Sequence, residues 1–168
     1  MTTLGPEGIE ALYRSHGHLA LRRARHLLGA DDLAQEALQE VFASLLRAPQ
    51  TVRHEGALVG WLYQATTHYC LNQLRNKRSS VRLLAQAAPP AVEAIDGSGD
   101  AVEALQDVRR LLERLPDQEA SAVIYYHLDG MTHDEVAGML GCSRRQVGYL
   151  LERATKAALE VQAKEQHA

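Results

Sequence analysis

Cysteine, aromatic residues and net charge are all scarce in this chain of 168 residues. Its two cysteines, Cys70 and Cys142, stand far apart in the sequence, which disfavours a disulfide framework and fits a reducing compartment. Aromatic residues make up only 5%, and because strands prefer aromatic and β-branched residues, a helical fold is favoured over a sheet. A net charge of −3 disfavours a protein that holds nucleic acid by charge alone.

Long hydrophobic runs are missing as well. No stretch approaches the roughly 18 apolar residues that a membrane span needs. The first ten residues do not combine a basic stretch with an apolar run, as a signal peptide does. We therefore expect a cytoplasmic protein without membrane insertion.

Signatures of catalysis and metal binding are also absent. The eight histidines form no HExxH motif, and the sequence contains no CxxC pair, phosphate-binding glycine loop or nucleophile elbow. We predict no catalytic residue, no metal and no cofactor, so the protein is not expected to be an enzyme. An enzyme or metal protein is one alternative, which a metal titration would test.

Charge and composition divide the chain into three parts. Residues 79–106 carry an acidic excess, a Pro89-Pro90 pair and a Gly97-Ser98-Gly99 stretch, which is typical of a linker. The expected fold class is all-α, with two small helical domains over residues 5–78 and 107–160, joined by this flexible linker.

Three or more helices are expected in the first domain. Apolar residues recur with helical spacing over three stretches, residues 6–28, 33–46 and 57–78. Gly29 ends the first stretch, and Asp31 or Asp32 is expected to cap the second. Trp61 has apolar neighbours in the third stretch and is expected in the core.

Four helices are expected in the second domain. The first covers residues 102–115, and Pro116 starts the next at a position where a missing N–H costs nothing. That helix is expected to end near Asp129 and Gly130. Two short helices follow.

Residues 131–147 have the pattern of a helix-turn-helix. Thr132 and Glu135 form a capping box for the first helix, and Ser143 can cap the second. Gly141 stands where the turn requires a positive φ. An ordinary helical hairpin is the alternative, but because these signals and the apolar spacing agree, the DNA-binding motif is favoured.

In such a motif the start of the second helix enters the major groove. Arginine can pair with guanine and glutamine with adenine, while the helix N-terminus can bind a phosphate. The candidate residues for duplex DNA are Ser143, Arg144, Arg145, Gln146, Tyr149 and Arg153.

Three stretches in order resemble a bacterial RNA polymerase sigma factor, the compact extracytoplasmic-function (ECF) type of the sigma-70 family. Residues 35–42 (QEALQEVF) are similar to the family's acidic-LVQEVF helix. Residues 61–78 are similar to its WLYxIA…LRRR helix, and residues 115–154 to its LPxxxR…EIAxxLGxSxxTV block. The resemblance implies a sigma region 2 domain over 5–78 and a sigma region 4 domain over 107–160.

The resemblance also implies a function and partners. The protein is expected to bind core RNA polymerase, through the β′ clamp helices, and to direct promoter recognition and melting. Promoter DNA and an anti-sigma factor are the other expected partners. The acidic linker is expected to mimic nucleic acid in the polymerase channel.

Two further sets of candidate residues follow from the resemblance. At 100° per residue, polar side chains of the QEVF helix share one arc that would bind polymerase. These core-polymerase-binding candidates are Asp32, Glu36, Gln39 and Glu40. The basic and amide-rich end of the third helix suits single-stranded DNA, because cations follow its phosphates. The candidates there are Asn72, Arg75, Asn76, Lys77 and Arg78.

Gly148 and Leu150 depart from the family pattern, which usually has basic residues there. Glycine inside a helix costs about 1 kcal/mol relative to alanine, and the loss of charge predicts an altered minus-thirty-five preference. The alternative function is a stand-alone helix-turn-helix regulator that binds duplex DNA as a dimer. It would explain residues 131–156 but not the QEVF helix.

Overall fold

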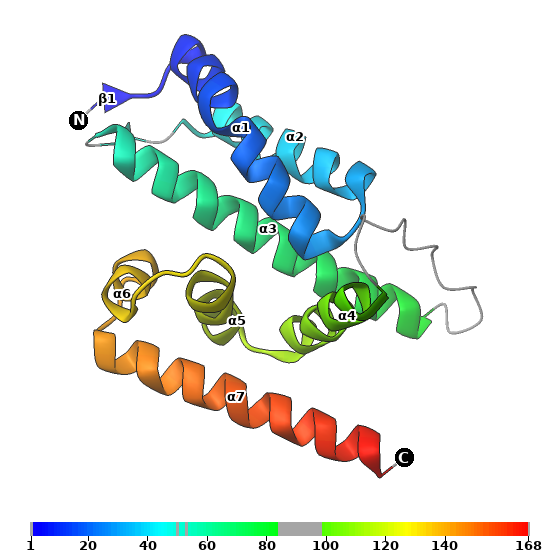
Figure 1. Ribbon diagram of the computed structural model, residues 1–168. Helices are drawn as coiled ribbons and strands as arrows, with labels where there is room; N and C mark the ends of the chain where they lie inside the picture. The colour runs from blue at the N-terminus through cyan, green and yellow to red at the C-terminus, as the bar shows by residue number, and fades with distance from the viewer. Residues whose placement is uncertain (1, 50, 53, 84–98, 168) are drawn as a thin grey trace. The chain divides into compact units, whose positions relative to one another are not determined.

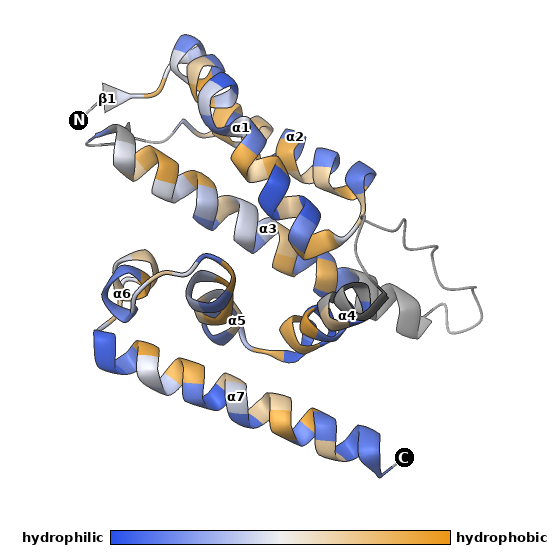
Figure 2. Ribbon diagram, viewed as in Figure 1, coloured by the Kyte–Doolittle hydropathy of each residue, from blue (hydrophilic) through white to orange (hydrophobic). Residues whose placement is uncertain are grey.

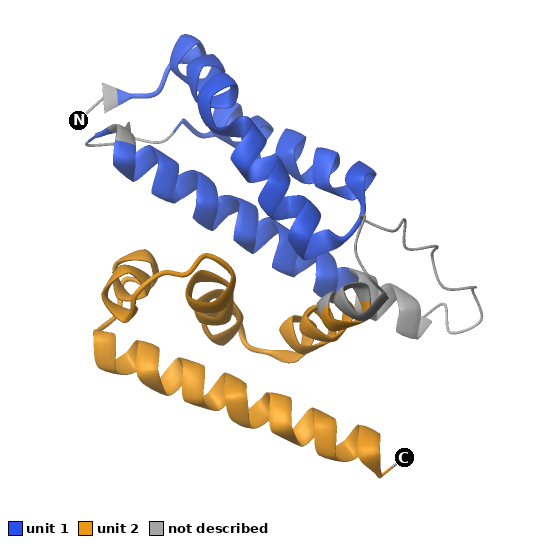
Figure 3. Ribbon diagram, in the orientation of Figure 1, with its two compact units in different colours: residues 1–97 blue, residues 98–168 orange. Residues whose placement is uncertain are grey.

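The structure is a computed structural model that describes residues 2–49, 51–52, 54–83 and 99–167. The side chains of residues 2, 51, 52, 55, 77–83, 99–102 and 105 lie outside this description. Two compact units are present, Met1–Gly97 and Ser98–Ala168 (Figure 3).

Unit 1 contains three long helices, α1 (Pro6–Leu28), α2 (Asp31–Arg47) and α3 (Glu55–Leu83), which pack against one another (Figure 1). Two very short strands, β1 (Thr2–Thr3) and β2 (Thr51–Val52), pair in antiparallel fashion. The sequence did not indicate this pairing, but the prediction of an all-α fold is confirmed.

The core of unit 1 lies where the apolar sides of the three helices meet. Figure 2 shows hydrophobic and hydrophilic residues alternating along these helices, as helical periodicity requires. The buried cluster consists of Ile9, Leu12, Ala20, Leu38, Val41, Phe42, Leu45, Leu58 and Leu62. Tyr13 meets Phe42 edge to face, with ring centroids 5.1 Å apart. Trp61 is half-buried and packs against the edge of this cluster rather than inside it.

The first turn of α2 corrects the predicted cap. Ala30 is the N-cap residue and provides no side-chain hydrogen bond, while Asp31 and Asp32 lie inside the first turn. Asp31 instead accepts from Arg25 Nε at 2.5 Å. Both carboxylates still stabilise the helix through its dipole, because negative charge is favourable near a helix N-terminus.

Unit 2 contains α4 (Gly99–Arg114), α5 (Asp117–Val123), the π-helix η1 (Ile124–Leu128), α6 (His133–Leu140) and α7 (Arg144–Gln166). Helices α4, α5 and α6 all pack against α7. The apolar residues at the centre of this packing are buried. They include Leu112, Leu115, Ala120, Ile124, Tyr125, Val136, Val147, Leu151 and Ala154.

Unit 2 corrects three sequence predictions. Pro116 is the extended N-cap residue rather than the first helical residue, so α5 begins at Asp117. The predicted helix that runs to Asp129 changes to a π-helix at Ile124, where the wider turn accompanies burial of Ile124 and Tyr125. The last helix is long rather than short and ends at Gln166.

The predicted linker remains a prediction in its central part, because residues 84–98 lie outside the described residues. At its edges, α3 extends to Leu83 and α4 begins at Gly99, so both helices enter the range 79–106. Among the described helices, none is both long and hydrophobic enough to traverse a lipid bilayer.

Candidate nucleic-acid interface and acidic face

Reciprocal side-chain caps fix both helices of the helix-turn-helix. Thr132 Oγ1 accepts from Glu135 N–H at 3.2 Å, and Glu135 Oε2 accepts from Thr132 N–H at 2.7 Å. At α7, Ser143 Oγ accepts from Gln146 N–H at 3.2 Å, and Gln146 Oε1 accepts from Ser143 N–H at 3.0 Å. Both arrangements are capping boxes, so the predicted caps of α6 and α7 are confirmed.

The turn between the two helices has the predicted geometry. Gly141 adopts φ 65° and donates its N–H to Ala137 O, a left-handed conformation that glycine adopts without a steric penalty. Val136 and Val147 are fully buried. The turn and these contacts hold α7 with one side in the core and the opposite side in solvent.

The exposed side of α7 presents a basic and aromatic surface. Arg145 Nε donates to Tyr149 Oη at 3.2 Å, and its guanidinium lies 5.7 Å from the Tyr149 ring centroid. Tyr149 is 50% exposed although it is a large aromatic residue. Arg144 lies 3.7 Å from Asp134, and both side chains are mostly exposed, so this pair holds Arg144 only weakly.

All six predicted DNA-binding side chains of α7 have partners inside unit 2, and two of these contacts bear directly on DNA recognition. Gln146 uses its carbonyl oxygen in the α7 cap, whereas adenine recognition needs both the carbonyl and the amide of glutamine. Arg153 lies 3.8 Å from the carboxylate of Glu119, whose side chain is 11% exposed. DNA binding by either residue would therefore compete with an existing contact.

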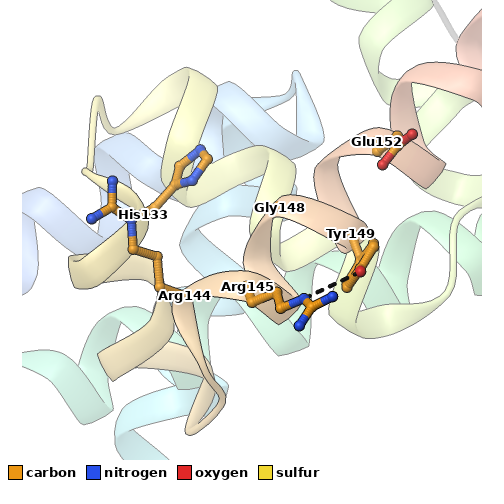
Figure 4. A pocket seen from close by; sticks show the side chains of 6 residues that line it. All are labelled: His133, Arg144, Arg145, Gly148, Tyr149 and Glu152. Carbon is orange, nitrogen blue, oxygen red and sulfur yellow. Dashed lines mark hydrogen bonds between the residues drawn. The ribbon is translucent and has the colours of Figure 1, made fainter.

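A hollow of about 630 Å³ lies on this exposed side of α7. Figure 4 shows its lining from α6 and α7. The lining residues are His133, Arg144, Arg145, Gly148, Tyr149 and Glu152. His133 and Glu152 were not among the candidates, because the prediction considered only basic, amide and aromatic groups. Helical spacing could have found Glu152, which stands eight residues after Arg144 on the same face.

The acidic face of α2, formed by Asp32, Glu36, Gln39 and Glu40, lies away from its buried apolar stripe. Glu40 is half-buried and the other three side chains are exposed. Glu40 pairs with Arg47 at 2.5 Å across two turns of the helix. Four polar side chains are thus brought to one surface, as the periodicity predicts.

Tyr69 of α3 lies beside this acidic face and responds to it electrostatically. Burial, together with the charges of Glu36 and Glu40, raises the pKa of Tyr69 above its ordinary value. A side-chain hydrogen bond with Gln73 acts in the opposite direction, and the phenol O–H can serve as a donor at the edge of the acidic face.

The predicted single-stranded-DNA residues lie near the end of α3. Asn72 and Asn76 are exposed, and Arg75 is half-buried. Lys77 and Arg78 belong to α3, but their side chains lie outside the described residues.

A buried polar cluster supports the middle of α3. Arg23 of α1 is 8% exposed, and its Nε donates to Thr67 Oγ1 at 2.8 Å. The Arg23 guanidinium also lies 5.0 Å from the Tyr63 ring centroid. Burial raises the pKa of the nearby Cys70 thiol to about 12, although Arg23 acts in the opposite direction. This cluster ties α1 to α3 and positions the helix that carries Asn72 and Asn76.

Among the described residues, no three or more histidine, cysteine, aspartate and glutamate side chains gather where a metal ion could be held.

Comparison with known proteins gives two regional matches. Residues 12–80 match the family model of sigma-70 region 2, and residues 105–157 match that of sigma-70, region 4. The ECF RNA polymerase sigma factor SigM of Mycobacterium tuberculosis is 27% identical over 145 residues, which are 86% of this chain and 72% of SigM. RNA polymerase sigma factor YlaC of Bacillus subtilis is 29% identical over 159 residues, 88% of each chain.

Solved structures show the same fold. The sigma factor RpoE of Bartonella quintana, in complex with the anti-sigma factor NepR, aligns with a TM-score of 0.54 and 18% identity. The alignment covers 94% of this chain and 98% of that one. CnrH, in complex with the cytosolic domain of CnrY, also aligns with a TM-score of 0.54, at 17% identity, over 95% and 90% of the two chains.

The two regional matches fall one in each compact unit, with region 2 before region 4, and together they span most of the chain. The match to region 2 disfavours a stand-alone helix-turn-helix regulator. The chain belongs to the sigma-70 family of RNA polymerase sigma factors and is of its extracytoplasmic-function type.

Proposed function

We propose that this transcription initiation factor binds core RNA polymerase through the acidic face of α2 and promoter DNA through α3 and α7. The polymerase performs the catalysis, and this chain supplies promoter recognition and melting in the bacterial cytoplasm. The observation that carries the proposal is the pairing of a region 2 unit, with an acidic helix face, and a region 4 unit, with a capped helix-turn-helix.

The acidic face of α2 suits a basic partner, which we propose to be the clamp helices of the polymerase β′ subunit. Exposed carboxylates attract cations over about a Debye length and speed association more than they add affinity. Glu36 and Glu40 are the central carboxylates, because they stand one turn apart and both act on Tyr69.

Charge reversal tests this contact directly. The double variant Glu36→Lys and Glu40→Lys is mixed with sigma-free core polymerase, and complex formation is measured by size-exclusion chromatography. We expect loss of the complex. The matched control reverses Glu7 and Glu10, two exposed carboxylates of α1, and keeps it. Retention of the complex by the first variant would contradict this docking site.

The end of α3 is proposed to hold the melted minus-ten strand. Amide groups at Asn72 and Asn76 can hydrogen-bond to unstacked bases, while Arg75, Lys77 and Arg78 follow the phosphates. Flipping or unstacking a base costs a few kcal/mol, so these contacts would have to offset that cost.

The melting role is tested by changing Arg75, Lys77 and Arg78 together to alanine. We expect loss of transcription from a fully paired promoter and its recovery on a template with a pre-opened bubble. A matched triple variant at Arg14, Arg22 and Arg25 of α1 removes the same charge and should transcribe both templates. Unchanged transcription of the paired template by the α3 variant would contradict the role.

Regulation by an anti-sigma factor is the remaining part of the proposal. It is supported by the structural neighbour RpoE, which was solved in complex with the anti-sigma factor NepR. Affinity capture on the tagged full chain from the source bacterium tests it. A single protein that blocks complex formation with core polymerase is the expected result.

A further inference from the structure

Gly148 stands at a position where neither backbone conformation nor packing requires glycine. It lies inside α7 and is not among the described glycines with positive φ. A Cβ at Gly148 would meet no heavy atom of the described residues within 4 Å, apart from its chain neighbours and the backbone of its own helix turn. Glycine weakens a helix interior relative to alanine, so the stability of the folded unit does not explain the glycine at this position.

Gly148 is the gap in a stripe of charged side chains. Arg144, Gly148 and Glu152 are spaced four residues apart and therefore share one face of α7. All three line the hollow on the exposed side of the helix (Figure 4). The gap thus has a cation on its N-terminal side and a carboxylate on its C-terminal side.

The carboxylate of Glu152 is unexpected on this surface, because the expected ligand, DNA, is an anion. Facing DNA phosphates, Glu152 would only repel. It becomes favourable where it accepts a hydrogen bond from a base amine, and the cytosine N4 amine is the usual donor for Glu or Asp in the major groove. Arginine in turn donates to guanine O6 and N7. A G·C pair presents both of these chemistries on one edge.

We propose that the hollow over Gly148 is a base-recognition pocket for a G·C pair, with Arg144 donating to guanine and Glu152 accepting from cytosine N4. The missing side chain at Gly148 lets the edge of the pair approach the helix backbone. This inference rests on the proposed function, since it requires α7 to enter the major groove. In this arrangement Glu152 increases specificity for one base pair, while its negative charge lowers the affinity for DNA of other sequences.

The test uses the full chain, reconstituted with core polymerase, and a library of randomised duplex DNA from which bound sequences are selected. Wild type is expected to enrich a G·C pair at one position. Glu152→Ala should reduce the cytosine preference there by about tenfold while retaining more random DNA. Glu160→Ala removes an equal charge from an exposed position further along α7 and should keep the preference.

Glycine variants provide the second arm. Gly148→Ala should raise the unfolding midpoint and weaken retention of the selected sequence by about tenfold. Gly138→Ala fills another open helical position and should raise the midpoint without weakening retention. If Glu152→Ala and Gly148→Ala both select the wild-type sequence with wild-type strength, the pocket is wrong. If wild type forms no complex or selects no sequence, the proposed function fails and the pocket fails with it.

Discussion

Replacing Ser143 by alanine tests the structure at the start of the DNA-binding helix. The change removes the Oγ acceptor that lies 3.2 Å from Gln146 N–H, while Gln146 Oε1 can still accept from the backbone N–H of residue 143. Loss of an N-cap side chain costs about 1 kcal/mol, within a range of roughly 0.5–2 kcal/mol. For a unit the size of Ser98–Ala168, each kcal/mol lowers the unfolding midpoint by roughly 4–8 °C.

Thermal unfolding of the full chain, followed by circular dichroism, measures this shift. Ser15→Ala is the control, because Ser15 bonds only within α1 and should leave the unit 2 transition unchanged. Gln146→Glu should retain the midpoint, because glutamate fills the same role in a capping box and favours the helix N-terminus. A Ser143→Ala midpoint equal to wild type would refute the cap as a source of stability.

Four further predictions start from residues of unit 1. The thiol pKa of Cys70 is about 12, so only about 10⁻⁴ of this thiol is ionised at pH 8. Iodoacetamide should therefore modify the half-buried Cys142 first, as measured by mass spectrometry. Equal rates of modification at the two cysteines would contradict this. Because the folded-state pKa values of Cys70 and Tyr69 are both raised, the free energy of unfolding should fall as pH rises from about 9 to 12. Glu36→Gln should lower the Tyr69 pKa in an absorbance titration, because it removes one of the charges that raise it. An unchanged Tyr69 pKa would contradict an electrostatic effect of Glu36 on Tyr69. Leu45→Ala empties a fully buried position and should cost roughly 2–5 kcal/mol in denaturant unfolding, whereas a cost under 1 kcal/mol would contradict the core assignment.

The sequence predicts those parts of the fold that depend on neighbouring residues. The caps at Thr132 and Ser143 and the turn at Gly141 follow from groups three or four residues apart, so the pattern and the structure agree. The cap of α2 was predicted wrongly, because the helix already begins at Asp31, after an Ala30 N-cap, and Asp31 pairs with Arg25 of the preceding helix. A pairing of this kind is visible only when the two helices are placed together.

The π-helix after Val123 could not be predicted for a similar reason. No local signal in residues 124–128 distinguishes a π-helical turn from an α-helical one, because apolar periodicity and capping patterns indicate only that a helix is present. The wide turn coincides with full burial of Ile124 and Tyr125 while Tyr126 and Leu128 remain exposed. Tertiary packing, which sequence patterns do not contain, therefore decides this geometry.

The candidate site was predicted as a set of residue types rather than as a surface. The expected basic and aromatic side chains of α7 do lie on its exposed side. Glu152 was not predicted, because DNA is an anion and a negatively charged side chain is not expected to bind it. The structure nevertheless places Glu152 in the same hollow as Arg144 and Gly148, because the three residues are spaced four apart along α7.

The capping box at α7 limits which side chains can set base preference. Gln146 Oε1 lies within hydrogen-bond distance of both the N–H and the Oγ of Ser143, so turning this amide toward adenine would open the cap and lose part of its stabilisation. Arg153 would have to leave Glu119, whose buried carboxylate would then lack this cation. Arg144 has only a weak, exposed pair to give up. Arg145 would give up one exposed hydrogen bond to Tyr149. If the proposed pocket over Gly148 reads a base pair, base preference depends on Glu152 more than on Gln146, which predicts that Gln146→Glu changes it less than Glu152→Ala does.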